Sequence, residues 1–424
     1  MWHVLAQSVE ALTTVLAVAG IGYFLAAWIA AQLFLAQRRG PLAAFAPGVS
    51  VLKSLKGLDP GMMDAFRSHC RQSYTGEYEL LFGVSSIDDP AAAAVKQLQA
   101  EFPERSIRLI ECPERLGTNG KVSTLVQLAP HARHEFLLIN DSDITVSPHY
   151  LERVMACFTP ADIPSGAKAR ADFATSSARL KSCPDTRGLS SAGDDFPAQE
   201  VGLVTALYRG RAHGTLPSKL EALGIATDFQ PSVLLAKILE KGLHYGLGST
   251  LAVSRAALNS IGGLLPLVDQ LADDYELGVR VDKAGYRVAL TPEVVETNIP
   301  AYSWRGFVDH QLRWARTVRD ARPRGYVGLI FTYGLSWALL NVLASGASPL
   351  SLWLLGLSFF LRLTLAMTVG AGVLADHQVL PNLWLLPLRD LVAMGVWVAG
   401  FAGNTIVWRG ERFALKNGKL EKAG

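Results

Sequence analysis

Two carboxylates, Asp141 and Asp143, follow directly after the apolar run EFLLIN. A short apolar run of this kind is consistent with a buried strand, and open α/β sheets bind ligands at the carboxyl ends of their strands. Carboxylates at alternate positions can share one hard divalent cation, which would bridge the diphosphate of a nucleotide sugar. We therefore predict that Asp141 and Asp143 bind a metal ion, with a solvated turn as the alternative.

A second acidic pair, Asp88 and Asp89, ends the run YELLFGVSSI. These carboxylates could accept hydrogen bonds from a uracil or a ribose, or they could cap the helix that begins near Pro90, and both interpretations stay open. Downstream, Lys121 in the sequence NGK could place an ammonium group near phosphate or base. The alternative for Lys121 is a solvated loop charge.

Further along, acidic residues cluster in Asp273-Asp274-Tyr275-Glu276. A carboxylate here could act as a general base that takes the proton of an acceptor hydroxyl while it attacks an anomeric carbon. The alternative is an acidic helix start that is stabilised by the helix dipole.

A basic and aromatic segment contains His310, Arg313 and Trp314, and Arg316 and Arg319 follow. Arginine can bind a diphosphate through two parallel hydrogen bonds, and tryptophan offers a flat face to a sugar or a lipid headgroup. The same composition is also typical of a helix that anchors a following membrane span.

The acidic and basic residues named above are far apart in the sequence, and a sheet could bring them together. Residues 48–325 alternate apolar runs with helix-like stretches such as DPAAAAVKQLQAEF. This rhythm predicts an α/β domain, a mostly parallel sheet with helices on both faces. Residues 161–199 lack apolar periodicity, so we expect a flexible insertion there.

Apolar segments lie on both sides of this domain. Residues 11–36 carry no charge and are long enough, at about 1.5 Å per residue, to cross a hydrocarbon core of roughly 30 Å, so residues 1–40 are predicted to be a membrane anchor. Arg38 and Arg39 follow the span and place the domain in the cytoplasm.

Three more apolar stretches lie within the predicted membrane region at residues 326–410, before a tail at 411–424. They cover residues 326–345, 349–373 and 383–408, and the last contains Arg389 and Asp390. It is therefore either a span with an internal ion pair or a membrane-surface helix. Three full crossings would leave the basic tail outside, so we predict that one of the three is interfacial or re-entrant.

Composition agrees with a membrane-attached globular domain. The chain has 424 residues, of which 50% are hydrophobic and 18% charged. A net charge of +3 gives no sign of a nucleic-acid partner, and the four cysteines form no CxxC pair or metal cluster.

The order of these motifs resembles that of the ceramide glucosyltransferase family, which includes related bacterial hopanoid-associated glycosyltransferases. The similar segments are LLFGVSSIDDPA, the NGK loop, LINDSDITV, GLVTALYRG, LADDYELG, HQLRWART, PLRDLV and WRGERF. The chain departs from the family pattern at His310, where Gln or Arg is usual.

The resemblance implies a GT-A domain and an inverting transfer from a UDP-sugar with Mg²⁺ or Mn²⁺. By position, Asp88 or Asp89 would contact the nucleotide, Asp143 the metal, and Asp274 would be the base. Arg313 and Trp314 would bind the diphosphate and the acceptor. A lipid acceptor in the bilayer is implied, with glucose as the donor sugar and ceramide as the acceptor, in a bacterial inner membrane.

Three alternatives stay open beside this expectation. The first is a hopanoid-associated enzyme that uses UDP-N-acetylglucosamine. The second is a processive polysaccharide synthase, which needs more membrane helices than this chain has. The third is a non-catalytic membrane scaffold that binds a sugar nucleotide.

Overall fold

The computed structural model describes residues 2–38, 44–159, 199–408, 411–416 and 418–422. Apart from its last residue, the insertion predicted at 161–199 lies outside these residues. A helix of 36 residues, α1 (Trp2–Gln37), begins the chain and covers the predicted N-terminal span.

A seven-stranded sheet organises the middle of the chain, with the order β3-β2-β1-β4-β6-β5-β7. Neighbouring strands are parallel except at β6, which is antiparallel to both β4 and β5. The mostly parallel sheet is therefore confirmed. The strands are β1 (Val49–Ser54), β2 (Tyr78–Val84), β3 (Ile107–Glu111), β4 (Phe136–Ile139), β5 (Val201–Ala212), β6 (Leu251–Ser254) and β7 (Arg287–Ile299).

Helices cover both faces of this sheet. Leu52 and Leu81 point into one apolar core, while Val51 and Leu80 point into the other, because successive side chains of a strand alternate between faces. Burial on both faces explains the continuous apolar runs of the strands. The first core contains α4 (Gly120–Leu128), α8 (Arg255–Ser260) and α9 (Asp273–Lys283); the second contains α2 (Met62–Cys70), α3 (Pro90–Glu101) and α5 (Tyr150–Met155).

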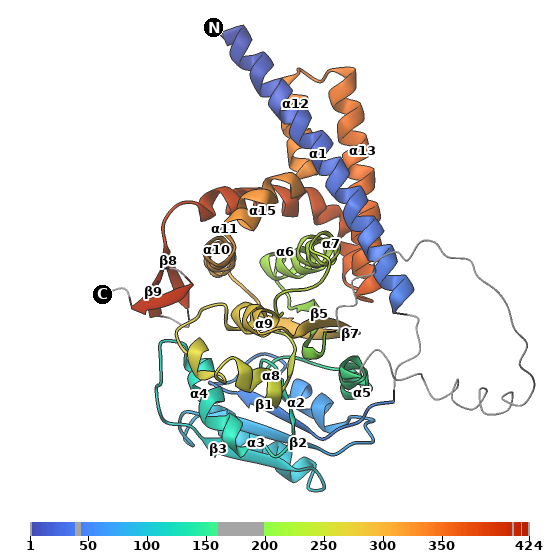
Figure 1. The fold of residues 1–424 in the computed structure, drawn as a ribbon. Coiled ribbons are helices and arrows are strands. Elements are labelled where there is room, and N and C mark those ends of the chain that lie inside the picture. The colour runs from blue at the N-terminus through green and yellow to red at the C-terminus, as the bar shows by residue number, and fades with distance from the viewer. Residues whose placement is uncertain (1, 39–43, 160–198, 409–410, 417, 423–424) are drawn as a thin grey trace, which may run out of the picture.

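A helical layer separates the sheet from the apolar end of the molecule (Figure 1). It contains α6 (Leu216–Gly224), a π-helical turn (Ile225–Phe229), α7 (Gln230–Leu239) and α10 (Trp304–Ala321). Residues 216–239 are apolar and long enough to cross a membrane, yet Figure 1 places α6 and α7 between the sheet and the later helix α15.

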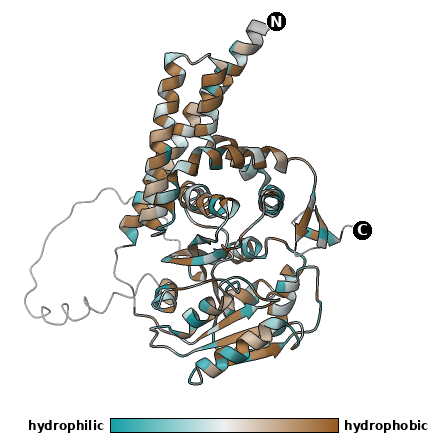
Figure 2. Ribbon diagram, turned by 180° about the vertical axis from the view of Figure 1, so that it is seen from behind, coloured by the Kyte–Doolittle hydropathy of each residue, from teal (hydrophilic) through white to brown (hydrophobic). Residues whose placement is uncertain are grey.

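Three apolar helices, α1, α12 (Gly334–Ala344) and α13 (Pro349–Ala366), extend together from one end of the molecule (Figure 1). Hydrophobic residues dominate them in Figure 2. α12 and the preceding Pro323–Thr332, which includes α11 (Pro323–Gly328), are together long and apolar enough for a membrane segment, and a bend of 57° separates them. A π-helical turn (Met367–Val373) extends α13, and Pro349–Val373 is long and apolar enough to cross a membrane.

Helix α15 (Leu386–Gly400) runs across the base of α12 and α13 rather than alongside them (Figure 1). The segment 380–398, which includes most of α15, exposes apolar side chains on one side and buries Arg389 and Asp390 on the other. This distribution is typical of a helix that lies in a membrane surface. The exposed side chains are those of Leu380, Trp384, Leu388, Leu391 and Val398.

Arg389 and Asp390 form ion pairs with other segments. The guanidinium of Arg362 in α13 is buried and lies 2.7 Å from Asp390 Oδ1, and it also bonds to Asp228 in the π-helical turn after α6. Arg389 Nε lies 3.2 Å from Asp228 Oδ2. The guanidinium of Arg389 fills the space beside Gly224, where a Cβ would lie 2.2 Å from Nε. We name these four charged residues, Arg362, Arg389, Asp228 and Asp390, the junction cluster.

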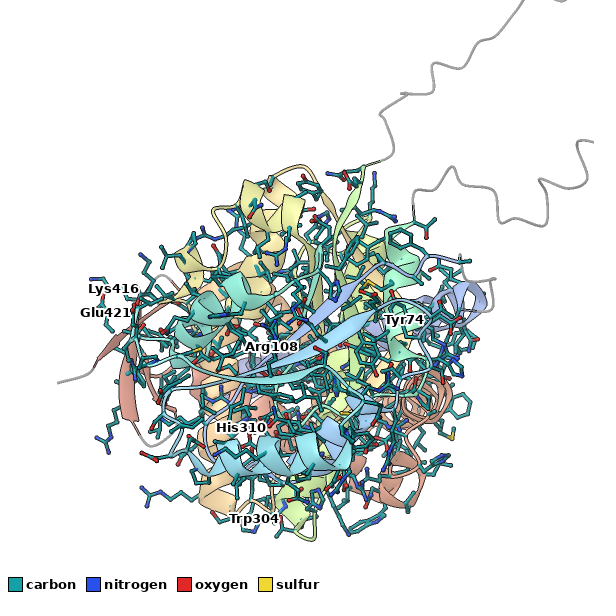
Figure 3. The ribbon with its side chains drawn as sticks, turned by 90° about the horizontal axis from the view of Figure 1, so that it is seen from below. Tyr74, Arg108, Trp304, His310, Lys416 and Glu421 are labelled. Atoms are coloured by element: carbon teal, nitrogen blue, oxygen red, sulfur yellow. The ribbon has the colours of Figure 1, made fainter. Side chains whose placement is uncertain are left out.

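The last residues form a small antiparallel sheet of β8 (Thr405–Trp408), β9 (Glu411–Lys416) and β10 (Lys419–Lys422). The segment predicted to be a tail is thus part of a folded unit. In Figure 3, the side chains of Lys416 and Glu421 from this C-terminal sheet lie together at the rim of the molecule.

Candidate active site

The turn that carries Asp141 and Asp143 follows β4 at its carboxyl end, as predicted. Lys53 from β1 is buried beneath the turn, and its ammonium group donates to the main-chain oxygen of Asp141 at 2.9 Å. Asp143 accepts hydrogen bonds from Thr297 Oγ1 at 2.5 Å and from the main-chain N–H of Asn298 at 3.1 Å, both in β7. The turn is therefore held from β1 and from β7.

Burial and neighbouring charges change the pKa values of Asp143 and of the lysine below the turn. Burial raises the pKa of the Asp143 carboxyl, and the negative charge of Asp141 raises it further. Burial also lowers the pKa of Lys53 to about 7, against the opposing effect of Asp143 and Asp141. The turn thus concentrates negative charge that a cation would compensate.

Lys121 joins motifs that are far apart in the sequence. Its ammonium group lies 2.7 Å from Asp141 Oδ1 and 3.4 Å from Asp273 Oδ2. Burial disfavours the charge on Lys121, but the two carboxylates outweigh this effect and raise its pKa. The NGK loop, the DSD turn and the DDYE segment therefore meet in one cluster.

Asn119 explains how Lys121 reaches this place. Its side-chain oxygen accepts from the main-chain N–H of Val122 and caps the start of α4. Its amide nitrogen donates to the main-chain oxygen of Gln270 at 2.8 Å and to Asp273 Oδ1 at 3.3 Å. One buried side chain thus fixes α4 against the start of α9.

Asp274 lies in the first turn of α9, next to Asp273. Burial raises the pKa of its carboxyl to about 6; the charge of Asp273 adds to this effect and that of Lys121 opposes it. A carboxyl with this pKa is ionised at neutral pH and can still accept a proton, as a general base requires. Glycines create the space for it, because a Cβ on Gly248 would lie 2.8 Å from Asp274 Oδ2.

Asp88 and Asp89 lie between the end of β2 and the start of α3 and differ in their surroundings. Asp89 caps α3 through the main-chain N–H of Ala91 at 2.9 Å, so the capping interpretation is confirmed for this residue. The same carboxylate accepts from the N–H of Gly57 in the loop after β1. Asp88 has an exposed side chain. No hydrogen bond or ion pair among the described residues joins Asp88 or Asp89 to Asp141 or Lys121 directly.

Aromatic side chains connect α10 to the carboxylate cluster. Trp314 contacts Phe229 edge to face, with ring centroids 6.0 Å apart, and Phe229 contacts Tyr208 of β5 at 5.7 Å. Burial raises the pKa of Tyr208, and the charges of Asp274 and Glu221 raise it further. Tyr208 therefore lies between the acidic cluster and the aromatic residues below α10.

His310 packs into the same aromatic group. Its ring stacks on Tyr302 at 5.3 Å and lies 5.6 Å from Trp314, and its Nδ1 lies 3.0 Å from a carboxylate oxygen of buried Glu221. Figure 3 places His310 and Trp304, both on α10, near each other on one side of the molecule. The residue at the position that departs from the family pattern is thus held by a buried carboxylate.

Among the described residues, Arg316 and Arg319 form hydrogen bonds to the main chain at the end of α15 and after it, and not to the carboxylate cluster. Arg316 donates to the main-chain oxygens of Ala402 and Thr405, and Arg319 to those of Gly400 and Gly403. These two guanidinium groups therefore hold the segment that connects α15 to β8. Arg313, which precedes them on α10, is half-buried. Burial raises the pKa of Tyr302, and the positive charge of Arg313 opposes this effect.

Sequence reasoning missed several residues of this site, namely Lys53, Tyr208, Glu221 and Phe229. The sequence signal for Lys53 is a lysine within the apolar run SVLKSL, because a strand that is covered on both faces must bury that charge. Phe229, Tyr208 and Glu221 carry no comparable signal, since apolar and amphipathic segments regularly contain such residues.

Carboxylate oxygens at the end of β4 are chemically suited to a hard divalent cation. Among the residues that the structure describes, no three His, Cys, Asp or Glu side chains are grouped to hold a metal ion. Asp141 and Asp143 can supply two oxygen ligands, and the side chain of Asp141 is 46% exposed. Mg²⁺ is usually bound by one or two carboxylates together with water and substrate phosphates, which matches this donor set.

The fold is similar to that of a solved mannosyltransferase, PcManGT from Pyrobaculum calidifontis, in complex with GDP-Man and Mn²⁺. The similarity covers 93% of this chain and 99% of that chain, with a TM-score of 0.50 and 18% sequence identity. The strand order, the helices on both faces and this likeness define the GT-A fold.

The chain belongs to glycosyl transferase family 21, whose family model matches residues 12–165 and 184–421. It is similar to ceramide glucosyltransferase 3 of Caenorhabditis elegans, with 24% identity over 384 residues, 87% of this chain and 73% of the relative. Ceramide glucosyltransferase 1 of the same organism is 22% identical over 386 residues, 88% of this chain and 72% of the relative. The predicted membership of the ceramide glucosyltransferase family is confirmed.

Proposed function

We propose that this glycosyltransferase transfers glucose from UDP-glucose to the hydroxyl group of a membrane lipid, ceramide in the first place, with inversion at the anomeric carbon. The observation that carries the proposal is the position of Lys121 between Asp141 and Asp273. This contact brings the carboxylates suited to a metal-bound diphosphate next to a carboxyl, Asp274, whose pKa suits a general base.

The donor would bind at the carboxyl end of β4. Asp141 and Asp143 would hold Mg²⁺ or Mn²⁺, which when bound supplies positive charge to the departing diphosphate. The ammonium group of Lys121 would add a second positive charge beside it. Asp88, exposed at the end of β2, would contact the nucleotide, while Asp89 holds the start of α3 in place.

Asp274 would carry the proton transfer. Its carboxylate takes the proton from the acceptor hydroxyl while that oxygen forms a bond to the anomeric carbon and the bond from this carbon to the diphosphate breaks. UDP leaves, and the sugar is attached to the lipid with inverted configuration. The reaction has one displacement step, so no sugar becomes attached to the protein.

The acceptor would reach the site from the membrane side, past α10. Trp314 and its aromatic neighbours offer flat apolar faces to a lipid headgroup or a sugar, and Arg313 offers a charge for the diphosphate. α12 together with the preceding Pro323–Thr332, and α13 with the turn that extends it, would be the two crossings of the C-terminal region, with α15 in the membrane surface. Two crossings return the chain to the side on which it started, in agreement with the contacts between the C-terminal sheet and the residues before α9.

The test is a transfer assay with membranes that contain the protein. Labelled UDP-glucose or UDP-N-acetylglucosamine is combined with ceramide or with a hopanoid that carries a free hydroxyl. We expect labelled glucosylceramide with the β configuration, because inversion of the α-linked donor gives the β product. A labelled hopanoid instead would identify the other acceptor, and no labelled glycolipid with any pairing would refute the proposal.

A further inference from the structure

The C-terminal sheet is hydrogen bonded to the loop that leads into the acidic cluster. The main-chain N–H of Leu420 donates to the oxygen of Asp269 at 3.0 Å, and the N–H of Leu271 donates to the oxygen of Gly418 at 3.2 Å. Gln270 pairs with Lys419 as an antiparallel bridge. Residues 269–271 thus pair with the edge strand β10 of the C-terminal sheet over a short stretch.

Side-chain packing makes the same connection. Leu271 is 8% exposed and forms a separate apolar core with four residues of the C-terminal sheet, which are Ile406, Phe413, Leu415 and Leu420. Among the residues that the structure describes, Leu271 is the only member of this core from outside the sheet, and Asp273 follows it after one residue. Its burial therefore fixes the chain shortly before the candidate base.

The other side of the loop is bonded to the NGK segment. Asp269 Oδ1 accepts from the main-chain N–H of Thr118 at 2.9 Å and from the Thr118 hydroxyl at 3.0 Å. The main-chain N–H of Asn119 donates to the oxygen of Val268 at 2.7 Å. The loop therefore lies between α4, which carries Lys121, and the C-terminal sheet.

Helix α10 is connected to the same sheet. Asp320 accepts a hydrogen bond from the main-chain N–H of Gly418, and Arg316 donates to the oxygen of Thr405 at 2.5 Å. The C-terminal sheet thus touches both the loop before Asp273 and the helix that carries Arg313 and Trp314. These two segments are the base side and the acceptor side of the proposed site.

We propose that the C-terminal sheet is a positioning element of the active site, and that Asp269 and Leu271 are positioning residues that act through the loop on Asp273 and Asp274. The inference rests on the proposed function for its catalytic meaning. Small displacements of catalytic groups reduce rates strongly, so fixing this loop from both sides would hold the base in a productive geometry. The loop and its two contact surfaces are defined in the structure independently of any activity.

Two point variants test this coupling in the full chain. Leu420→Ala removes apolar contact around Leu271, and Val407→Ala, on the exposed side of β8, is the matched control. Hydrogen–deuterium exchange of residues 268–277 measures loop order without any substrate. We expect faster exchange in Leu420→Ala and unchanged exchange in Val407→Ala, and equal exchange in both variants would overturn the proposal.

The kinetic part separates positioning from simple loss of fold. In the lipid transfer assay, Leu420→Ala should lower kcat on the order of 10-fold to 100-fold while the KM for the UDP-sugar changes little. Asp269→Ala should behave in the same way, and Asp269→Asn, which keeps an oxygen acceptor for Thr118, should recover most of the rate. A loop that exchanges faster in an enzyme with unchanged kcat would refute the positioning role. If the unaltered protein transferred no sugar at all, the proposed function would fail, and hydrogen exchange would still decide whether the sheet orders the loop.

Discussion

Gly248 leaves room for the carboxylate of Asp274, since a Cβ on this glycine would lie 2.8 Å from Asp274 Oδ2. The same loop meets α9 again at Gly246, where a Cβ on Gly278 would lie 2.1 Å from the Gly246 nitrogen. Backbone therefore packs directly on backbone beside the candidate base. Glycine is required at position 278 by this close approach of two chain segments, and at position 248 it leaves room for the carboxylate.

Gly248→Ala should displace the Asp274 carboxylate and lower kcat, on the order of 100-fold if the shift approaches 1 Å. The measurement is steady-state transfer with UDP-glucose and a ceramide acceptor. Gly242→Ala is the matched control, because its Cβ would make only ordinary contacts, at 3.6 Å from the ring of His244. Equal rates in the two variants would show that the space beside Asp274 is not needed.

Asp274→Asn removes the proposed base with little change in shape. General-base catalysis contributes about 10²-fold to 10⁴-fold, so kcat should fall by that amount. Binding of UDP-glucose, followed by calorimetry, should persist, because the carboxylates at 141 and 143 are unchanged. Turnover that survives this substitution would exclude Asp274 as the base.

The pH dependence of kcat/KM should report the pKa of the base. A group whose pKa is raised to about 6 by burial is protonated, and inactive as a base, below that pH, so activity should be lost as the pH falls through about 6. The positive charge of Lys121 lowers this pKa, so Lys121→Met should move the acidic limb to higher pH. Lys96→Met, on the exposed side of α3, is the control. An acidic limb at the same pH in Lys121→Met and Lys96→Met would contradict the coupling.

Arg362→Met should destabilise the fold. Removal of one partner from a buried ion pair costs about 3–5 kcal/mol, because it leaves the buried charge of Asp390 without the arginine that pairs with it, while Asp228 keeps only Arg389. The free energy of unfolding can be compared in detergent by urea titration. Arg362→Met combined with Asp390→Leu should recover part of the loss, and Arg305→Met, whose side chain is 92% exposed in the native protein, should change nothing. Unaltered stability of the single variant at position 362 would contradict this account.

Much of the fold was predictable because the central strands of the sheet are buried on both faces. LLFGV and FLLI are continuous apolar runs for this reason, and the carboxylates that follow such runs mark the ends of strands. The antiparallel direction of β6 could not be predicted in this way, because strand direction leaves no trace in the pattern of a short apolar segment such as LAVS.

The contacts of charged residues were harder to predict than their positions in the chain. Arg316 and Arg319 resemble ligands of a diphosphate in sequence, yet they bind main-chain oxygens, and residue type does not distinguish these acceptors. The C-terminal sheet did leave a signal: Asn417-Gly418, a dipeptide typical of hairpin turns, separates RFALK from KLEK. Residues 216–239 are apolar enough to cross a membrane, but they lie between the sheet and α15, so burial inside the protein also explains their apolar character.

The junction cluster has a consequence for the biosynthesis of the chain. Arg362 would enter the bilayer with α13, where a lone guanidinium is strongly disfavoured. Asp228, 134 residues earlier, is already made at that moment, but Asp390 lies 28 residues later and is still to be synthesised. In the newly made chain, Arg362 of α13 would therefore be paired with Asp228 alone until α15 packs beneath α13 and brings Asp390 to it. Stable insertion of this helix would then depend on completion of the segment that follows, so the chain from residue 349 to residue 400 would mature as one unit.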